Sequence, residues 1–171
     1  MVARKLISQS FSDSGILDLF SLDEAKGRDA LPHILIGDEY GGAHHLRTID
    51  ELEVEGRQVA STIARPVKSK RPSYYRQAQK VQDNGVFRAK VVRIKGADGN
   101  LMEKETGSIF FPDEWTTQEL LESVVEVSKT PGEHNPDTRA YTHKGTSRGV
   151  PMIVNTDDTT GKIVAARPER G

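Results

Sequence analysis

Apolar residues in the first part of the chain come in short groups, which predicts short elements. The apolar positions before the first proline include Ile16, Leu17, Leu19, Phe20 and Leu22. Their spacing predicts one or two short helices within residues 1–30, with a helical turn over 22–26. Residues 34–36 are expected to form a short strand that enters a glycine turn. Residues 49–64 fit a helix and strands equally well.

Two alternating stretches in the middle of the chain predict a β-hairpin. Residues 86–94 alternate enough for a half-buried strand, and residues 101–105 are expected to return as its partner. The dipeptide Asp98-Gly99 between them is a strong signal for a hairpin turn. A further apolar run over 108–111 ends at Pro112.

A helix is predicted to begin after Thr116, because Thr116 and Glu119 have the spacing of a capping box. The apolar positions on its face are Leu120, Leu121, Val124 and Val125. Thr130-Pro131-Gly132 should end it, and residues 131–140 are expected to be loop.

The chain is expected to close with a hairpin, with strands at 150–155 and 162–168 joined by a turn over 156–161. The whole pattern predicts an α+β domain: short N-terminal helices, then a mostly antiparallel β-sheet packed around one strong helix. We expect residues 1–30 to be an N-terminal helical segment and residues 31–171 the main domain.

Composition removes several classes of protein. The chain is 35% hydrophobic and 29% charged, which indicates a modest core under a well-solvated surface. Its 24 basic and 25 acidic residues argue against a wide electrostatic grip on duplex DNA. With no cysteine there is no disulfide scaffold, thiolate-bound metal or cysteine nucleophile. We expect no membrane span and no signal peptide.

Two stretches carry candidate chemistry. Residues 33–45 hold three of the five histidines beside a glycine pair, which suits a general acid and a general base at neutral pH. A structural or incidental cluster is the alternative. Residues 65–76 are the most basic segment, and Tyr74 and Tyr75 lie among its cations. They suit stacking on single-stranded bases, or else hold a solvated loop to the body.

Several motifs, taken in order, resemble the EndoU endoribonucleases, especially the bacterial members found as toxin domains in contact-dependent growth inhibition and polymorphic toxin proteins. HILIGD (33–38) and GGAHHL (41–46) resemble the two histidine motifs of that family. GSIFFPDEW (107–115) resembles the segment before its helix, and KGTSRGVPMIV (144–154) and GKIVAARP (161–168) resemble its two closing strands. The resemblance covers residues 31–168 and implies the fold group of barnase, EndoU, colicin and RelE.

The resemblance implies a catalytic trio of His33, His44 and Lys104. One histidine would take the proton of a ribose 2′-hydroxyl and the other would protonate the leaving 5′-oxygen. Lys104 would stabilise the charge on the phosphorane, and the product would be a 2′,3′-cyclic phosphate formed without any metal or cofactor. His45 would orient the site or contact the substrate.

The C-terminus departs from the family pattern. Where the family has Ser/Thr-x-Tyr-Pro, this chain has Ala165, Ala166, Arg167 and Pro168. Arg167 could replace the missing groups as a bidentate phosphate ligand, or it is a surface residue. Tyr141 and Thr142 on the preceding strand are further candidates, and Ser108 is expected to contact substrate.

The remaining polar candidates have simpler interpretations. We expect His134 to be solvated, His143 to lie at a surface strand end, and Trp115 to anchor the helix start. Asp157 and Asp158 are expected to form a turn, because two carboxylates alone do not hold a hard cation. Asp38 and Glu39 could orient an imidazole or only end a strand.

The sequence therefore predicts a toxin endoribonuclease that cleaves RNA, with tRNA as the expected target. It would be part of a larger secreted or cell-surface protein, act in the cytoplasm of a target cell, and be a monomer until an immunity protein binds. One alternative is a metal-dependent nuclease that uses His33, His44 and Asp38. The other is a non-catalytic RNA-binding or interaction module that uses the basic tyrosine segment.

Overall fold

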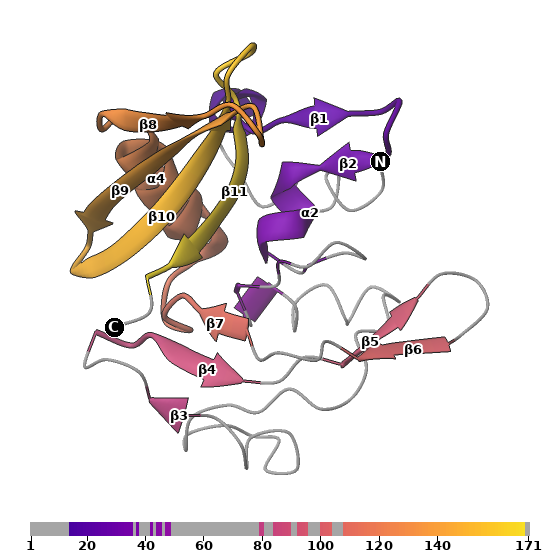
Figure 1. The fold of residues 1–171 in the computed structure, drawn as a ribbon. Coiled ribbons are helices and arrows are strands. Elements are labelled where there is room, and N and C mark those ends of the chain that lie inside the picture. The colour runs from indigo at the N-terminus through magenta and orange to yellow at the C-terminus, as the bar shows by residue number, and fades with distance from the viewer. Residues whose placement is uncertain are drawn as a thin grey trace.

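A computed structural model of the chain describes about two thirds of its residues. The described residues are 14–35, 37, 42, 44–45, 47–48, 79–80, 84–89, 92–95, 100–103 and 108–169. The C-terminal half forms a curved antiparallel sheet with a helix against one face, and the earlier segments lie beside and below it (Figure 1).

The main sheet has four antiparallel strands in the order β11-β10-β9-β8. Their bounds are Gly132–Asn135 for β8, Ala140–Ser147 for β9, Val150–Asp157 for β10 and Ile163–Pro168 for β11. Burial alternates strictly along β10, so that Met152 and Val154 point into the core while Ile153 and Asn155 point the other way. A two-residue turn joins β9 to β10, and both of its residues, Arg148 and Gly149, have positive φ. This is the geometry of a hairpin turn that matches strand twist.

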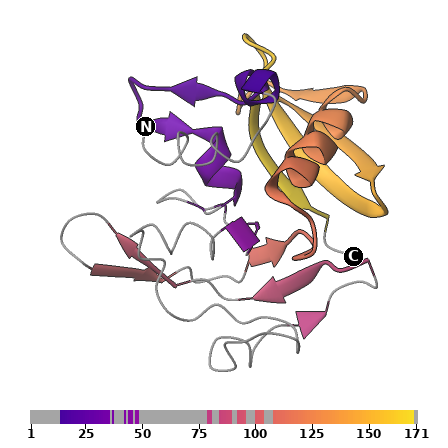
Figure 2. The same ribbon diagram turned by 180° about the vertical axis from the view of Figure 1, so that it is seen from behind.

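Helix α4 (Thr117–Ser128) covers one face of this sheet, as the view from behind shows (Figure 2). The capping box is present, since Thr116 Oγ1 accepts the Glu119 N–H at 3.1 Å and Glu119 Oε1 accepts the Thr116 N–H at 3.1 Å. The predicted apolar face is buried and contacts β9 and β10. The opposite face of the sheet is not covered by this helix.

The smaller elements precede α4 in the chain. They are η1 (Ser14–Leu19), β1 (Leu22–Asp23), β2 (Arg28–Asp29), α2 (Ala30–Leu35), β3 (Gln79–Lys80), β4 (Phe87–Ala89), β5 (Val92–Lys95), β6 (Asn100–Glu103) and β7 (Ser108–Phe110). Among them, η1, α2, β4 and β7 contribute buried side chains to the core. Helix α2 packs against β11, and Phe20 bridges to Ile163 at the start of that strand. Phe87 and Phe110 stack across β4 and β7 with ring centroids 5.0 Å apart.

The predicted α+β class is confirmed, with a four-stranded antiparallel sheet and one long helix. The central hairpin is confirmed by the pairing of β5 with β6, and the closing hairpin by that of β10 with β11. Leu17 and Phe20 of the N-terminal segment belong to the same buried core as α4. The boundary expected at residue 30 stays a prediction. No helix among the described residues is long and apolar enough to cross a membrane.

Four local expectations were wrong. Residues 22–29 form strands β1 and β2 around a turn, where a helical turn was expected. Residues 34 and 35 belong to helix α2, which the Asp29 carboxylate caps by accepting the Leu31 N–H at 3.2 Å. The residues expected to form one strand over 86–94 include β4, which pairs with β7, and β5, which pairs with β6, and the loop expected over 131–140 contains β8. Residues 49–64 and 65–76 lie outside the described residues.

Candidate active site

Helix α2 and the residues after it bring the two histidine motifs together. His33 is half-buried in the last turn of α2. Two backbone hydrogen bonds hold the second motif against this helix. The His44 N–H donates to the Ile34 carbonyl at 2.8 Å, and the His45 N–H donates to the Leu35 carbonyl at 3.1 Å. His44 is therefore fixed beside the end of the helix that carries His33.

Gly42 makes this close approach possible. Its φ is +77°, and a Cβ placed on it would lie 1.8 Å from the His33 carbonyl oxygen. No other residue type fits there, because a side chain would overlap the backbone of α2. This contact explains why the second residue of the glycine pair, Gly42, is a glycine.

The ring of His44 is held by strand β7. Its Nδ1 lies 2.7 Å from the Ile109 carbonyl oxygen, and the His44 carbonyl accepts the Phe111 N–H at 2.8 Å. A carbonyl oxygen can only accept, so Nδ1 must carry a proton. In the neutral imidazole the basic lone pair is then on Nε2. His44 is buried, with 9% of the residue exposed.

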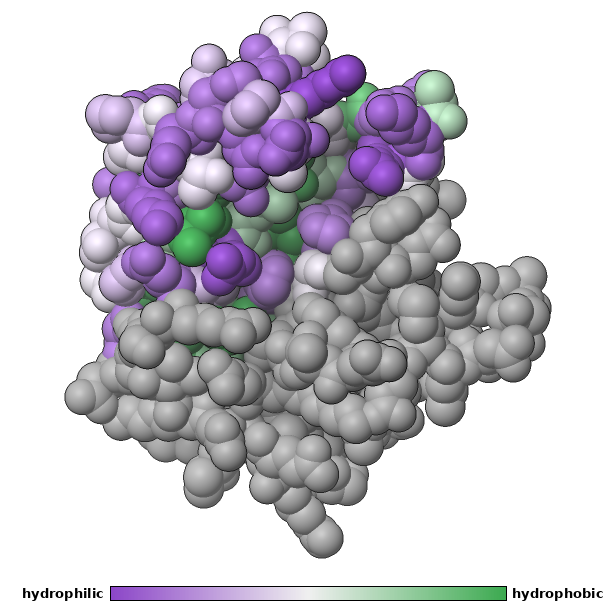
Figure 3. Space-filling view, in the orientation of Figure 1, coloured by the Kyte–Doolittle hydropathy of each residue, from purple (hydrophilic) through white to green (hydrophobic). Residues whose placement is uncertain are grey.

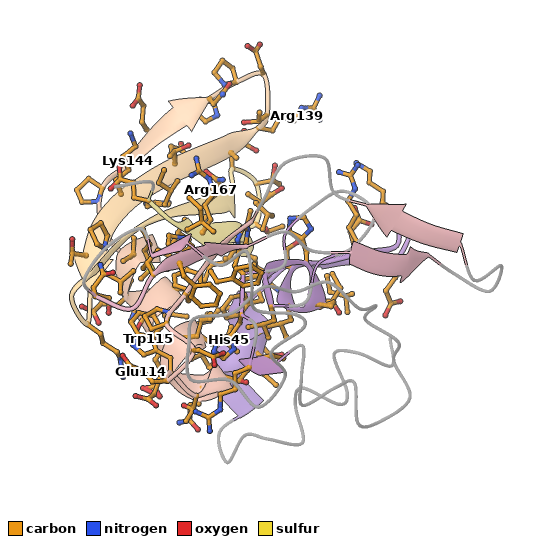
Figure 4. All side chains as sticks on the ribbon, turned by 90° about the horizontal axis from the view of Figure 1, so that it is seen from below. His45, Glu114, Trp115, Arg139, Lys144 and Arg167 are labelled. Atoms are coloured by element: carbon orange, nitrogen blue, oxygen red, sulfur yellow. The ribbon has the colours of Figure 1, made fainter. Side chains whose placement is uncertain are left out.

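His45 points into the protein, toward the start of α4 (Figure 4). Its side chain is 0% exposed, and its Nε2 donates to the Trp115 carbonyl at 2.9 Å. Its Nδ1 accepts from Thr48 Oγ1 at 2.6 Å, and Thr48 Oγ1 lies 2.9 Å from Thr117 Oγ1. Of the two roles considered for His45, this geometry favours orienting the site over contacting a substrate.

The Arg167 side chain is exposed on the sheet face that α4 leaves uncovered. Arg167 pairs with Ile153, and the residue that precedes it on β11, Ala166, is buried on the opposite face. Thr142 shares the uncovered face and donates a hydrogen bond to Asn155 Oδ1 at 3.0 Å. Tyr141 lies on the other face, where its ring is 4.9 Å from His134 and 6.5 Å from His143. The structure thus groups Thr142 with Arg167 and separates Tyr141 from them.

His143 is a correction to the sequence analysis. It was expected at a surface strand end, yet it is only 8% exposed in the middle of β9. Its Nδ1 donates to the Thr130 carbonyl at 2.7 Å, and its Nε2 lies 2.8 Å from Thr156 Oγ1. Gly132 is close enough that a Cβ there would be 2.6 Å from the imidazole. This ring joins the end of α4 to two strands.

Three simpler expectations are confirmed. His134 is exposed, with its Nε2 3.0 Å from Asp158 Oδ2. Trp115 is buried before α4 and stacks on Phe111 at 5.8 Å. Asp157 begins a turn in which the backbone N–H groups of Thr160 and Thr159 hold the pKa of its carboxyl below the ordinary value.

Several predicted site residues lie where their side chains are not described. Lys104, Tyr74, Tyr75, Asp38 and Glu39 fall outside the described residues. Ser108 is the first residue of β7 and pairs with Ala89, and its backbone is the part of it that is described. Within the described part of the chain, no group of three or more His, Asp or Glu side chains could hold a metal ion.

The sequence analysis missed Lys144. It is exposed on β9, on the same face as Arg167, and pairs with Ile153 from the other side. The sequence of β9 has no apolar alternation that would mark this position, and the strand registers were needed to bring Lys144 and Arg167 into one row.

Comparison with protein families places the chain in a known group. A family described as bacterial EndoU nuclease matches residues 27–170, which include every element from β2 to β11. No curated protein matches the chain significantly.

Proposed function

The chain belongs to the bacterial EndoU nuclease family, and from that premise we propose that it is an endoribonuclease that cleaves RNA by attack of the 2′-hydroxyl, without a metal ion. One observation carries this proposal: His44 is fixed beside α2, with its Nδ1 bound to the Ile109 carbonyl. A histidine held in this way presents Nε2 as a base at neutral pH. His33 is in the last turn of α2, the helix against which the His44 backbone is bound, and it is the expected acid.

The reaction follows from these assignments. Nε2 of His44 takes the proton of the ribose 2′-hydroxyl, and the resulting oxygen nucleophile attacks the adjacent phosphorus. The bond from phosphorus to the 5′-oxygen breaks as protonated His33 gives its proton to that oxygen. Lys104 is assigned to the negative charge that develops on the phosphorane. The products are a 2′,3′-cyclic phosphate and a free 5′-hydroxyl, and DNA is not a substrate because it has no 2′-hydroxyl.

The wider biological role rests on resemblance to the toxin members of the family. We propose tRNA as the target, in the cytoplasm of a cell that receives the domain from a larger secreted or cell-surface protein. An RNA-cleaving domain would kill its producer, so a cognate immunity protein is expected to bind the free, monomeric toxin. Acidic side chains on that protein would complement exposed cations around the site.

The test is cleavage of total tRNA in excess chelator by the wild type, His33→Ala, His44→Ala and Lys104→Ala. We expect discrete fragments that end in 2′,3′-cyclic phosphate, and their loss in all three variants. Intact RNA with wild-type protein in chelator, followed by cleavage on addition of Mn²⁺, would overturn the metal-independent mechanism. RNA that stays intact in both conditions would overturn the assignment as an active ribonuclease.

A further inference from the structure

The uncovered face of the main sheet carries a row of side chains that crosses three strands. Arg167 on β11 pairs with Ile153 on β10, and Ile153 pairs with Lys144 on β9. Residues paired across neighbouring strands point to the same face, so the two cations flank one half-buried isoleucine. Strands lie about 4.8 Å apart, so the backbones of Lys144 and Arg167 are separated by about 9.6 Å.

This row lies on an accessible surface. Both cations are exposed, and the view onto this face shows hydrophobic surface among hydrophilic side chains over β10 and β11 (Figure 3). Figure 4 shows Lys144 and Arg167 on the sheet, away from His45, Glu114 and Trp115. Helix α4 is on the opposite face, because a Cβ on Gly145 would meet Val127 and Thr130 of the helix end at 3.4 Å.

The charges of the row are available to a ligand. Among the residues that the structure describes, neither Lys144 nor Arg167 forms an ion pair, and the ion pairs present involve His134 and Arg148. Acidic side chains near the face do not neutralise the row. Asp157 holds the backbone N–H groups of its own turn, and Glu133 is on the edge strand opposite Thr142. Glu169 lies two residues beyond Arg167, and its backbone N–H donates to the Pro151 carbonyl at 2.9 Å.

The position of the row relates it to the candidate active site. Strand β11 is the edge of the sheet that packs against α2, the helix that carries His33. The row therefore begins at the strand nearest the histidines and runs away from them, across β10 to β9. A neighbouring row adds polar groups, where Thr142 and Asn155 are hydrogen-bonded to each other at 3.0 Å.

We infer that this row, Lys144–Ile153–Arg167, is an extended binding site for single-stranded RNA outside the catalytic centre. The two cations would bind phosphates of the strand, and Ile153 would contact a ribose or base between them. An RNA backbone fits the row because it repeats negative charge along a line, with apolar sugar and base surface between the charges. This inference rests on the proposed function, which makes RNA the ligand. It adds Lys144 to the residues proposed to bind that RNA.

The experiment measures binding of a fluorescent dodecanucleotide of 2′-O-methyl RNA, which the proposed reaction cannot cleave. Affinities of wild type, Lys144→Ala and Arg167→Ala are measured over a series of NaCl concentrations. Each substitution should weaken binding several-fold and reduce the slope of log K against log salt by about 0.7, the value for one phosphate contact on a single strand. Lys144→Arg and Arg167→Lys should keep the slope of the wild type, because they keep the charge.

The matched control is Lys129→Ala, which removes an exposed cation from the helix side of the sheet. It should leave affinity and slope unchanged. If Lys144→Ala and Arg167→Ala bind RNA as Lys129→Ala does while wild-type protein still cleaves tRNA, the row is not an RNA site and the proposed function stands. Binding with the expected slopes but no cleavage of unmodified RNA would keep the row and overturn the reaction.

Discussion

A backbone carbonyl determines which nitrogen of His44 can react. The Ile109 carbonyl accepts a hydrogen bond from Nδ1–H of His44, so base chemistry is assigned to Nε2. His143 is a second enclosed histidine, with the Thr130 carbonyl 2.7 Å from its Nδ1 and Thr156 Oγ1 2.8 Å from its Nε2. The sequence could place His44 in a motif, but it could not show that His143 is buried, because that depends on the contacts of β9 with α4.

These two histidines give a matched pair of variants. His44→Ala should lower kcat/KM for RNA by about 10²-fold to 10⁴-fold, the usual contribution of a general acid or base. His143→Ala should keep most of the activity of the folded protein but lower its melting temperature, because the Thr130 carbonyl loses its buried partner. Steady-state kinetics and thermal unfolding of both variants test this assignment. A loss of kcat/KM in His143→Ala as large as that in His44→Ala would contradict it.

Gly42 makes a second prediction at the scale of one residue. Gly42→Ala should lower kcat/KM at least about 10-fold, because the new methyl group would overlap the His33 carbonyl and displace His44. Gly149→Ala is the control, since Gly149 has the same φ of +77° but no atom within 4 Å of the added Cβ.

Both glycine variants should lose about 1 kcal/mol of stability to left-handed backbone strain. We expect only Gly42→Ala to lose activity beyond what that loss of stability explains. Equal activities of the two variants, compared at a temperature where both are folded, would show that the contact with α2 does not position the site.

Elements with local signals could be predicted, and elements that depend on distant partners could not. Helix α4 has its cap and its apolar face in one short stretch of sequence. Strand β8 has no alternation, since all four of its residues are exposed, and it becomes a strand only by pairing with β9. The strand predicted over 34–36 lies partly in helix α2, whose start is marked in the sequence by the capping residue Asp29 and by a proline in the first turn.

The cap of α4 gives a prediction on pH. Two hydrogen bonds with Thr116 hold the pKa of the Glu119 carboxyl below the ordinary value of 4.5. The bond to the Thr116 backbone has the larger effect and the bond to its side chain the smaller one. A carboxyl with a lowered pKa in the folded state stabilises the protein above the unfolded pKa, and this contribution is lost as the pH falls through the folded pKa. Wild-type protein should therefore melt at a higher temperature than Glu119→Gln at pH 7, with the difference shrinking below pH 4.5. A difference that stays constant from pH 7 to pH 3 would contradict this cause.

At the scale of the whole molecule, the candidate site is made by three elements distant in sequence. Helix α2 carries His33 and supports the backbone of His44, β7 binds the His44 ring, and β11 joins α2 to the sheet face with Arg167. The hydrophobic pattern was enough to predict the α+β class, and the sequence motifs were enough to propose His33 and His44 as candidates. They could not predict the Ile109 contact or the row from Arg167 to Lys144, because both depend on how separate strands are placed and paired.

We propose that this nuclease uses the 2′-hydroxyl of RNA as its nucleophile. The most direct measurement compares a short RNA that the protein cleaves at one position with the same RNA carrying a single 2′-deoxynucleotide immediately 5′ of that phosphate, both in excess chelator. With the 2′-hydroxyl as nucleophile, we expect cleavage of the first RNA to a 2′,3′-cyclic phosphate and no cleavage of the second RNA at that position. Equal cleavage of the two RNAs would show that another nucleophile attacks the phosphorus, and the roles assigned to His33 and His44 would be wrong.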